Sequence, residues 1–259
     1  MNAARDPASP EKTKATFDAD GFAAFHPLLD GEQMVEVNKQ LDRFLSAVVP
    51  AMPADRVYRE DPEDPSSIKQ LQKMFEYDPW AEELIEQSQI REVAETVLGE
   101  PVRAVNMQYF NKPPGIGKPT PPHQDGYFFH LNPCRAVTGW LALEPVYEEN
   151  GCVHYVRGSH RQEGFRPHAP SGVLGFSQAI TDFGTQADHA DTVAMPGGPG
   201  TFLIHDAKTV HWAGANTSST RSRRALGFIY YAKSAVFDEE AHAAYQKLLK
   251  DQLAAEGRI

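Results

Sequence analysis

Hydrophobic positions in the first part of the chain recur mainly with a helical period. We expect one helix to begin at Asp30 or Gly31 and a second helix to run from about Trp80 to Leu98. The segment Phe17–Leu29 has the pattern of a short strand and a turn. The apolar positions that define the first helix are Met34, Val35, Val37, Leu41, Phe44 and Leu45.

The pattern changes after residue 101, where short apolar or alternating runs replace the helical period. Loops rich in Gly, Pro, Ser and His separate these runs, and no helical pattern alternates with them. Many short strands without intervening helices predict an antiparallel sandwich or barrel, and therefore a mainly β fold. The candidate strands are Val102–Phe110, Tyr127–Leu131, Ala136–Leu143, Cys152–Val156, Thr192–Ala194, Thr201–Ile204, His211–Ala213 and Arg224–Tyr231.

Three segments are expected to lie outside the regular elements. Residues 1–14 are polar and are predicted to be frayed, and residues 50–66 carry the prolines and acidic residues of a loop. The connection 157–191 is long and rich in Gly, His and Ser, which favours a functional loop or lid. We find no internal repeat and predict one domain over residues 1–259. Its predicted parts are a helical N-terminal part at about 15–100, a β core at about 101–235 and a C-terminal helix at 237–256.

Composition limits the partners that this chain can have. Its 259 residues are 41% hydrophobic and 10% aromatic, which is typical of a globular protein with a substantial core. The formal net charge of -10 argues against binding nucleic acid through its phosphates, and no apolar run approaches the roughly 18 residues that span a bilayer. The two cysteines, Cys134 and Cys152, are too few for a disulfide framework. We therefore expect a cytoplasmic monomer or homodimer that acts on a small molecule, without a nucleic-acid or membrane partner.

The strongest chemical signal is the His-x-Asp motif formed by His123 and Asp125. On an extended strand, two residues at this spacing would leave the same face. A distant second histidine would complete two imidazoles and one carboxylate on one side of a metal. Non-heme Fe(II) oxygenases use this arrangement because it leaves positions open for a co-substrate and O2. An arginine pair soon after His211 offers a charged fork for a carboxylate, so the combination predicts Fe(II), 2-oxoglutarate and O2.

Each predicted metal ligand has a competitor in the sequence. A second His-x-Asp motif, His189–Asp191, lies among polar residues and stands too close to His211 along the chain for ligands that come from well-separated strands. His205 competes with His211, but it ends an apolar run that reads as a buried strand, and a structural hydrogen bond would explain it. We therefore predict that His123, Asp125 and His211 bind the metal.

Several motifs follow one another in a fixed order along the second half of the chain. They are Asn111-Lys112-Pro113-Pro114-Gly115, Pro122-His123-Gln124-Asp125-Gly126, Trp140-Leu141-Ala142-Leu143-Glu144, Glu149-Asn150-Gly151-Cys152, Gly158-Ser159-His160, His211 through Asn216, and Arg223-Arg224-Ala225. From about Asn106 to Tyr231 the chain resembles the phytanoyl-CoA dioxygenase-like Fe(II)/2-oxoglutarate oxygenases. The resemblance implies a double-stranded β-helix (a cupin-like jelly roll) with flanking α-helices. It also implies a hydroxylase that releases succinate and CO2, because Asp125 is present where related halogenases carry a small residue.

The resemblance also implies which residues hold 2-oxoglutarate. Ser222 occupies the position where the family's arginine usually stands, and the following Arg-Arg-Ala indicates a one-residue insertion. Arg223 is then the better match, with Arg224 and Arg221 as the alternatives. A second group is expected to point toward the co-substrate, although each member could equally be a structural strand residue. This group is Gln108, Asn111, Lys112 and Trp140.

The substrate is the least determined part of this interpretation. The family includes enzymes that act on acyl-CoA thioesters, small polar metabolites, phosphonates and natural-product scaffolds. The acidic net charge and the lack of a conspicuous basic cluster favour a small metabolite. Two alternatives stay open: a cupin-like metal enzyme that does not use 2-oxoglutarate, and a catalytically silent ligand-binding protein on the same fold.

Overall fold

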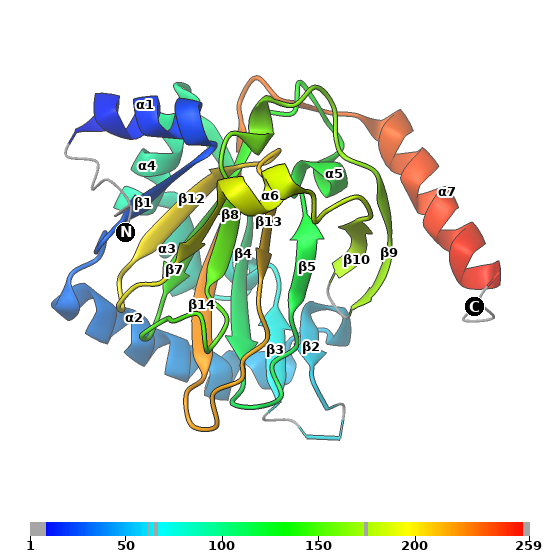
Figure 1. Ribbon diagram of the computed structural model, residues 1–259. Coiled ribbons are helices and arrows are strands. Elements are labelled where there is room, and N and C mark those ends of the chain that lie inside the picture. The colour runs from blue at the N-terminus through cyan, green and yellow to red at the C-terminus, as the bar shows by residue number, and fades with distance from the viewer. Residues whose placement is uncertain (1–8, 62, 65–66, 174–175, 256–259) are drawn as a thin grey trace.

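Two antiparallel β-sheets face each other, and helices of the N-terminal part cover the outer face of the larger sheet (Figure 1). The structure is a computed structural model that describes residues 9–61, 63–64, 67–173 and 176–255. Strand order within each sheet departs from chain order, so the chain crosses repeatedly between the sheets. This arrangement agrees with the predicted mainly β fold with flanking helices.

The elements have the following bounds. The larger sheet contains β1 (Phe22–Phe25), β2 (Val57–Arg59), β3 (Ile68–Leu71), β4 (Val102–Lys112), β7 (Ala136–Ala142), β12 (Phe202–Asp206) and β14 (Arg223–Ala232). The smaller sheet contains β5 (Thr120–His123), β8 (Val153–Val156), β11 (Thr192–Met195) and β13 (His211–Ala213). Two further pairs are β9 (His168–Val173) with β10 (Phe176–Ile180), and β6 (Leu131–Asn132) with β15 (Val236–Phe237). The α-helices are α1 (Pro10–Asp20), α2 (Gly31–Arg43), α3 (Pro79–Glu86), α4 (Gln89–Leu98), α5 (Gly126–Phe129), α6 (Gln186–Asp191) and α7 (Glu239–Ala255).

Alternation along the central strands gives the larger sheet two different faces. Within the described residues its order is β1-β12-β7-β14-β4-β3-β2, and the smaller sheet has the order β11-β8-β13-β5. On β7, Leu141 packs outward with the helices, whereas Thr138 and Trp140 point toward the smaller sheet. On β14, Phe228 joins the outer core and Arg223 faces inward. The outer face therefore carries the main hydrophobic core. The inner face carries a smaller hydrophobic cluster and, beside it, polar side chains that line a space between the sheets.

Local signals explain where the N-terminal helices begin. Asp30 caps α2 and forms a capping box with Gln33, in which each side chain accepts the other residue's backbone N–H. The helix predicted over 80–98 is instead two helices, so that prediction was wrong. The break falls at Ser88, whose hydroxyl oxygen accepts the N–H of Ile90 and starts α4.

Three further predictions about local structure were wrong in whole or in part. Of residues 1–14, predicted to be frayed, Pro10 onward form α1, which the side chain of Ser9 caps; residues 1–8 lie outside the described part of the chain. The end of this helix also occupies the start of Phe17–Leu29, which was predicted as a strand and a turn. The run Tyr127–Leu131 is mostly the helical turn α5 and not a strand. Its aromatic composition favours a strand, but the chain must turn there after β5.

Two connections carry more regular structure than their composition predicted. Residues 50–66 include β2, and the long connection 157–191 contains β9, β10 and α6. The C-terminal helix predicted over 237–256 corresponds to α7. Among the described helices, none has the length and apolar character needed to cross a membrane.

The core assignment predicts a contrast between two substitutions. Leu141→Ala should lower the free energy of unfolding by about 2–5 kcal/mol, because a fully buried leucine on a central strand would leave a cavity. Val35→Ala on α2 should change it by less than about 0.5 kcal/mol, since Val35 is 70% exposed. Urea denaturation followed by circular dichroism measures both. Equal losses in the two variants would contradict this assignment of the helix and sheet faces.

Candidate functional site

The two histidines predicted as metal ligands lie opposite each other on adjacent strands. His123 at the end of β5 pairs with His211 at the start of β13, and their ring centroids are 4.1 Å apart. The Nδ1 atom of His123 lies 2.8 Å from the carbonyl oxygen of Pro121, and Nδ1 of His211 lies 3.0 Å from that of Thr209. Because a carbonyl oxygen can only accept, each Nδ1 carries the proton. Each Nε2 therefore keeps the lone pair that a metal would use.

Asp125 reaches the same point from the turn that follows β5. It has helical backbone angles at the start of α5, so the prediction that it shares an extended strand with His123 was wrong. Its Oδ1 lies 3.4 Å from Nε2 of His123 and 3.6 Å from Nε2 of His211. One donor atom from each of these three residues lies within 4.8 Å of the other two. Two imidazoles and a carboxylate in this arrangement suit a transition metal with open positions.

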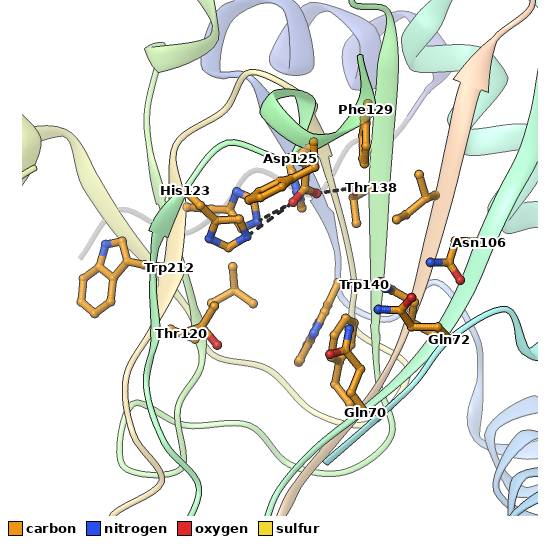
Figure 2. Close-up of a pocket in the computed structure, with 18 of the residues that line it drawn as sticks. Gln70, Gln72, Asn106, Thr120, His123, Asp125, Phe129, Thr138, Trp140 and Trp212 are labelled. Carbon is orange, nitrogen blue, oxygen red and sulfur yellow. Dashed lines mark hydrogen bonds and ion pairs between the residues drawn. The ribbon is translucent and has the colours of Figure 1, made fainter. Parts of the chain in front are cut away.

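The second oxygen of Asp125 is held by the larger sheet. The Thr138 hydroxyl donates to Oδ2 at 2.5 Å (Figure 2). Nε2 of His205 lies 3.2 Å from the same oxygen. The other ring nitrogen of His205 lies 2.9 Å from the hydroxyl of Tyr155. A carboxylate oxygen can only accept, so Nε2 of His205 donates to Asp125 and Nδ1 accepts the Tyr155 hydroxyl. Thr138 and His205 therefore both orient the carboxylate of Asp125. His205, the competitor for His211, is thus placed to make a structural hydrogen bond.

Burial and close contacts among the site residues together set the ionisation of His211 and Asp125. Burial, together with the neighbouring imidazoles, lowers the pKa of His211 well below its usual range. Burial also raises the pKa of the Asp125 carboxyl, but contacts with three surrounding imidazoles outweigh it and hold that pKa well below the usual range. A neutral imidazole and an ionised carboxylate are the forms that coordinate metals.

Arg223 is a buried cation that faces the space between the sheets. It is 4% exposed, and its guanidinium carbon lies 5.5 Å from the centre of the Trp140 ring. Its Nε has no hydrogen-bond partner, and Arg223 forms no ion pair with another described residue. Burial lowers the pKa of this guanidinium to about 10, so it stays charged at neutral pH. A buried charge without a counter-ion is costly, and a bound carboxylate would relieve that cost.

The two alternative arginines lie elsewhere. Arg224 follows Arg223 on β14 and so leaves the opposite face, where its Nε donates to the carboxylate of Glu144 at 3.1 Å. Arg221 lies before the strand and pairs with Glu149. Neither lines the cavity described next.

A cavity of about 420 Å³ lies between the sheets beside the three donor atoms. Gln108 and Trp140, two members of the predicted second group, line it together with Arg223. Its volume falls within the range of about 300–1,000 Å³ that is typical of small-molecule sites. The arrangement therefore places the candidate metal ligands and the candidate carboxylate-binding cation around one space.

Asn111 and Lys112, the other two members of that group, lie outside this cavity. Asn111 leaves the opposite face of β4 from Gln108, and its amide donates to a backbone carbonyl of β3. Lys112 lies against a much smaller adjoining cavity, and its amine donates to the carbonyl oxygens of Lys118 and Gly214. Burial first, and neighbouring positive charge second, lower its pKa to about 6.

Gln124, which lies between the two ligands of the motif, is a connecting residue that sequence reasoning missed. Its side chain is fully buried. Its Nε2 donates to the carbonyl oxygen of Lys208 at 2.7 Å, and its Oε1 accepts the N–H of Arg166 at 2.9 Å. The turn with Asp125 is thereby tied both to the segment before β13 and to the connection after β8. Nothing in the local sequence indicates these partners, because they lie far along the chain.

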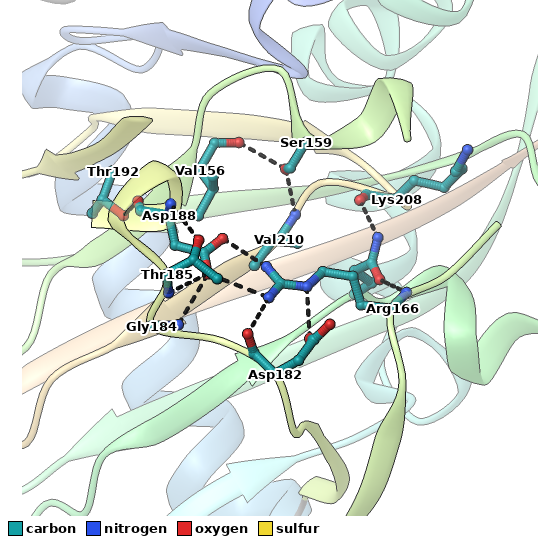
Figure 3. Close-up of polar contacts among 11 residues, drawn as sticks. Val156, Ser159, Arg166, Asp182, Gly184, Thr185, Asp188, Thr192, Lys208 and Val210 are labelled. Atoms are coloured by element: carbon teal, nitrogen blue, oxygen red, sulfur yellow. Dashed lines mark hydrogen bonds and ion pairs between the residues drawn. The ribbon is translucent and has the colours of Figure 1, made fainter. Parts of the chain in front are cut away.

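Arg166 also anchors the connection 157–191 beside the site (Figure 3). Its guanidinium donates to Asp188 at 2.6 Å and to Asp182 at 2.8 Å. Although burial opposes ionisation, the hydrogen bonds that Asp188 accepts lower its pKa to about 2. A buried ion pair between Arg166 and Asp188, extended to the exposed Asp182, therefore holds the segment that was predicted as a loop or lid. The alternative motif His189–Asp191 lies here, on α6, and does not line the cavity.

Known proteins show how far the similarity of this chain extends. Phytanoyl-CoA dioxygenase domain-containing protein 1 from Danio rerio is 33% identical over 165 residues, which cover 61% of this chain and 55% of that protein. The chain spans about half the length of the first curated relatives it matches. The structure of EctD from S. alaskensis with bound Fe has a TM-score of 0.74 at 20% identity, covering 92% of this chain and 82% of that one. The epimerase SnoN in complex with Fe3+, alpha ketoglutarate and nogalamycin RO has a TM-score of 0.70 at 23% identity, covering 90% and 87%.

These structures confirm the predicted jelly-roll fold with flanking helices. A family model described as phytanoyl-CoA dioxygenase (PhyH) matches residues 17–225. The matched segment begins in α1, contains both sheets up to the start of β14, and extends past Arg223. The chain therefore belongs to the phytanoyl-CoA dioxygenase (PhyH) family.

Proposed function

We propose that this protein is a non-heme iron oxygenase that uses 2-oxoglutarate and O2 to hydroxylate a C–H bond of a small molecule, with release of succinate and CO2. One observation carries the proposal: three donor atoms that could hold a metal and a buried arginine without an ion-pair partner among the described residues face the same cavity. Family membership supports it. So does the fold shared with SnoN, whose complex contains Fe3+ and alpha ketoglutarate, another name for 2-oxoglutarate.

His123, Asp125 and His211 would hold Fe(II). The donor set fits this ion, because two imidazole nitrogens and one carboxylate oxygen leave positions on the cavity side for other ligands. When bound, Fe(II) and 2-oxoglutarate together supply the activation of O2 that C–H oxidation requires. Thr138 and His205 keep Oδ2 of the aspartate occupied, so that Oδ1 faces the two histidines.

Arg223 would bind the carboxylate of 2-oxoglutarate that lies farther from the metal. Its guanidinium packs over Trp140, which restricts its direction, and Gln108 lines the same cavity. Asn111 and Lys112 would act indirectly, because their hydrogen bonds to backbone carbonyls hold β4 against β3 and the loops beside it. The clamp and the metal ligands come from different strands, so the two sheets must be assembled before the site exists.

Aromatic residues would shield the site from water. Phe128 and Phe129 lie on α5, directly after Asp125, and Tyr231 lies on β14. All three line the cavity. Excluding water strengthens polar contacts within the site and limits oxidation of anything but the substrate. The carboxylate of Asp125 completes the metal-ligand set, which favours hydroxylation over halogenation.

Removing the support of Asp125 should weaken the metal site. Thr138→Val should lower Fe(II) affinity about 10- to 100-fold, because Oδ2 loses the hydroxyl that orients it. Anaerobic competition with a chelating dye measures the affinity. Thr96→Val on α4 is the control and should leave it unchanged. Unaltered affinity in Thr138→Val would contradict the orienting role, and normal Fe(II) binding by His211→Ala would contradict the ligand assignment.

Removing Arg223 should weaken binding of 2-oxoglutarate. Arg223→Leu should raise its dissociation constant at least about 30-fold, since losing a buried charged partner costs about 2–5 kcal/mol. An anaerobic titration of the Fe(II) protein, followed by the visible charge-transfer band of the chelate, measures this constant. Arg224→Leu is the matched control, because Arg224 pairs with Glu144 outside the cavity.

Two results of that titration would overturn parts of the proposal. Normal affinity in Arg223→Leu with iron still bound would remove Arg223 from the co-substrate site. Absence of the band in the unmodified, iron-loaded protein would remove 2-oxoglutarate itself and favour the cupin-like enzyme that works without it.

A further inference from the structure

Three amide side chains gather on one wall of the cavity, and one of them, Gln70, also lines the smaller adjoining cavity together with Arg223. Gln70 lies on β3, Gln72 is the first residue after that strand, and Asn106 lies on the neighbouring strand β4. Figure 2 shows all three on one side of the cavity, with Trp212 on the opposite side. Pairing of β3 with β4 sets this arrangement, since both strands belong to the larger sheet.

The hydrogen-bonding groups of this amide wall are largely unused within the described residues. Gln70 is 3% exposed, and its Oε1 has no hydrogen-bond partner. The side chain of Gln72 forms no hydrogen bond with another described residue. Asn106 uses its Oδ1 to accept the N–H of Lys73 at 2.8 Å, which leaves its NH2 group for a ligand. Leaving such groups unpaired in a buried site is costly, so the wall suits a ligand that both donates and accepts.

The charges around the cavity disfavour a charged ligand at this wall. Asp125 is the only acidic residue among the described residues that line the cavity, and it belongs to the metal site. An ammonium group would therefore lack a counter-ion. Among the described residues, the cations that line a cavity with these amides include Lys73, Arg223, Lys69 and Lys112. The amine of Lys73 donates to the carbonyl oxygen of Val105 and lies 3.7 Å from the carboxylate of Glu76, and Lys69 lies 3.7 Å from the carboxylate of Glu60. Arg223 would be paired with the co-substrate. The amide wall is thus close to electrically neutral.

The size and remaining lining of the cavity narrow the choice further. Its volume of about 420 Å³ must also hold the co-substrate, so a bulky acyl thioester is disfavoured. Lys73 and Arg223 are the only lysine and arginine among the described lining residues, too few to pair the phosphates of CoA once the co-substrate occupies Arg223. Phe129 and Tyr231 offer apolar ring faces against which the C–H groups of a small ring can pack.

We propose that Gln70, Gln72 and Asn106 form the substrate-recognition subsite, and that the substrate is an uncharged ring compound bearing several hydroxyl groups. Each hydroxyl can donate to an amide oxygen and accept from an amide NH2, which matches the unused groups of the wall. The inference rests on the proposed function for the identity of the reaction, but recognition itself needs neither iron turnover nor O2.

A binding experiment without catalysis tests the subsite. Isothermal titration calorimetry, with 2-oxoglutarate present and O2 excluded, would compare three probe sets. The first contains methyl glucoside, phenyl glucoside and myo-inositol; the second contains cyclohexylamine and phenethylamine; the third contains acetyl-CoA and octanoyl-CoA. We expect binding within the first set alone. Tighter binding of an amine or an acyl-CoA, or no binding by any member of the first set, would overturn the proposal.

Variants connect binding to the amide wall. The double variant Gln70→Met and Gln72→Met keeps side-chain length but removes both amides, and it should raise the dissociation constant of the bound polyhydroxy probe at least about tenfold. Gln87→Met, at an exposed position after α3, is the matched control and should bind as the unmodified protein does. Unchanged probe affinity in the double variant would overturn the assignment of the wall.

The co-substrate titration separates this proposal from the proposed function. The double variant should give the same 2-oxoglutarate charge-transfer band as the unmodified protein, because neither glutamine is one of the three metal ligands or the arginine clamp. A lost band in the double variant alone would mean that the amides serve the co-substrate and not the substrate. A band missing from the unmodified protein would refute the 2-oxoglutarate chemistry, while polyhydroxy binding would still support the subsite.

Discussion

The carboxylate of Asp125 joins the two sheets, and the geometry of the candidate site depends on it. One oxygen faces His123 and His211 of the smaller sheet, while the other is held by Thr138 and His205 of the larger sheet. A buried carboxylate is tolerated only when its oxygens are paired, so neither sheet can shift without losing one of these contacts. The distance between the sheets, and with it the depth of the cavity, is therefore coupled to the position of one side chain.

The sequence predicted the residues of the candidate site better than the directions of their side chains. The motif spacing and the resemblance pointed to three residues that the structure brings together. Strand alternation separates two members of the second group: Gln108 faces the cavity, whereas Asn111, an odd number of positions away on β4, leaves the opposite face. The same alternation separates Arg223 from Arg224. Both differences follow from the two-residue period of a strand, so a stricter use of that period would predict them.

Other features depend on contacts that local sequence does not encode. The aromatic run after Asp125 has strand-forming composition, yet it forms a helical turn because the chain must leave β5 there. Gln70 lies on a strand that was not predicted, since β3 is short and its pairing with β4 joins distant parts of the chain. The partners of Gln124 are equally remote in sequence. Contacts between distant parts of the chain determine these three features, and the local sequence gives little indication of such contacts.

Gln124 links the order of a long peripheral segment to the order of the candidate metal site. Its amide holds the turn with Asp125 against the backbone of Arg166, and Arg166 in turn holds Asp182 and Asp188. A metal ion that binds His123, Asp125 and His211 only when they are ordered would also stabilise the contacts that keep them ordered. By reciprocity, whatever stabilises the β9–β10 pair and α6 would raise the affinity of the candidate site for a metal. The connection 157–191 and the candidate site thus share one conformational equilibrium.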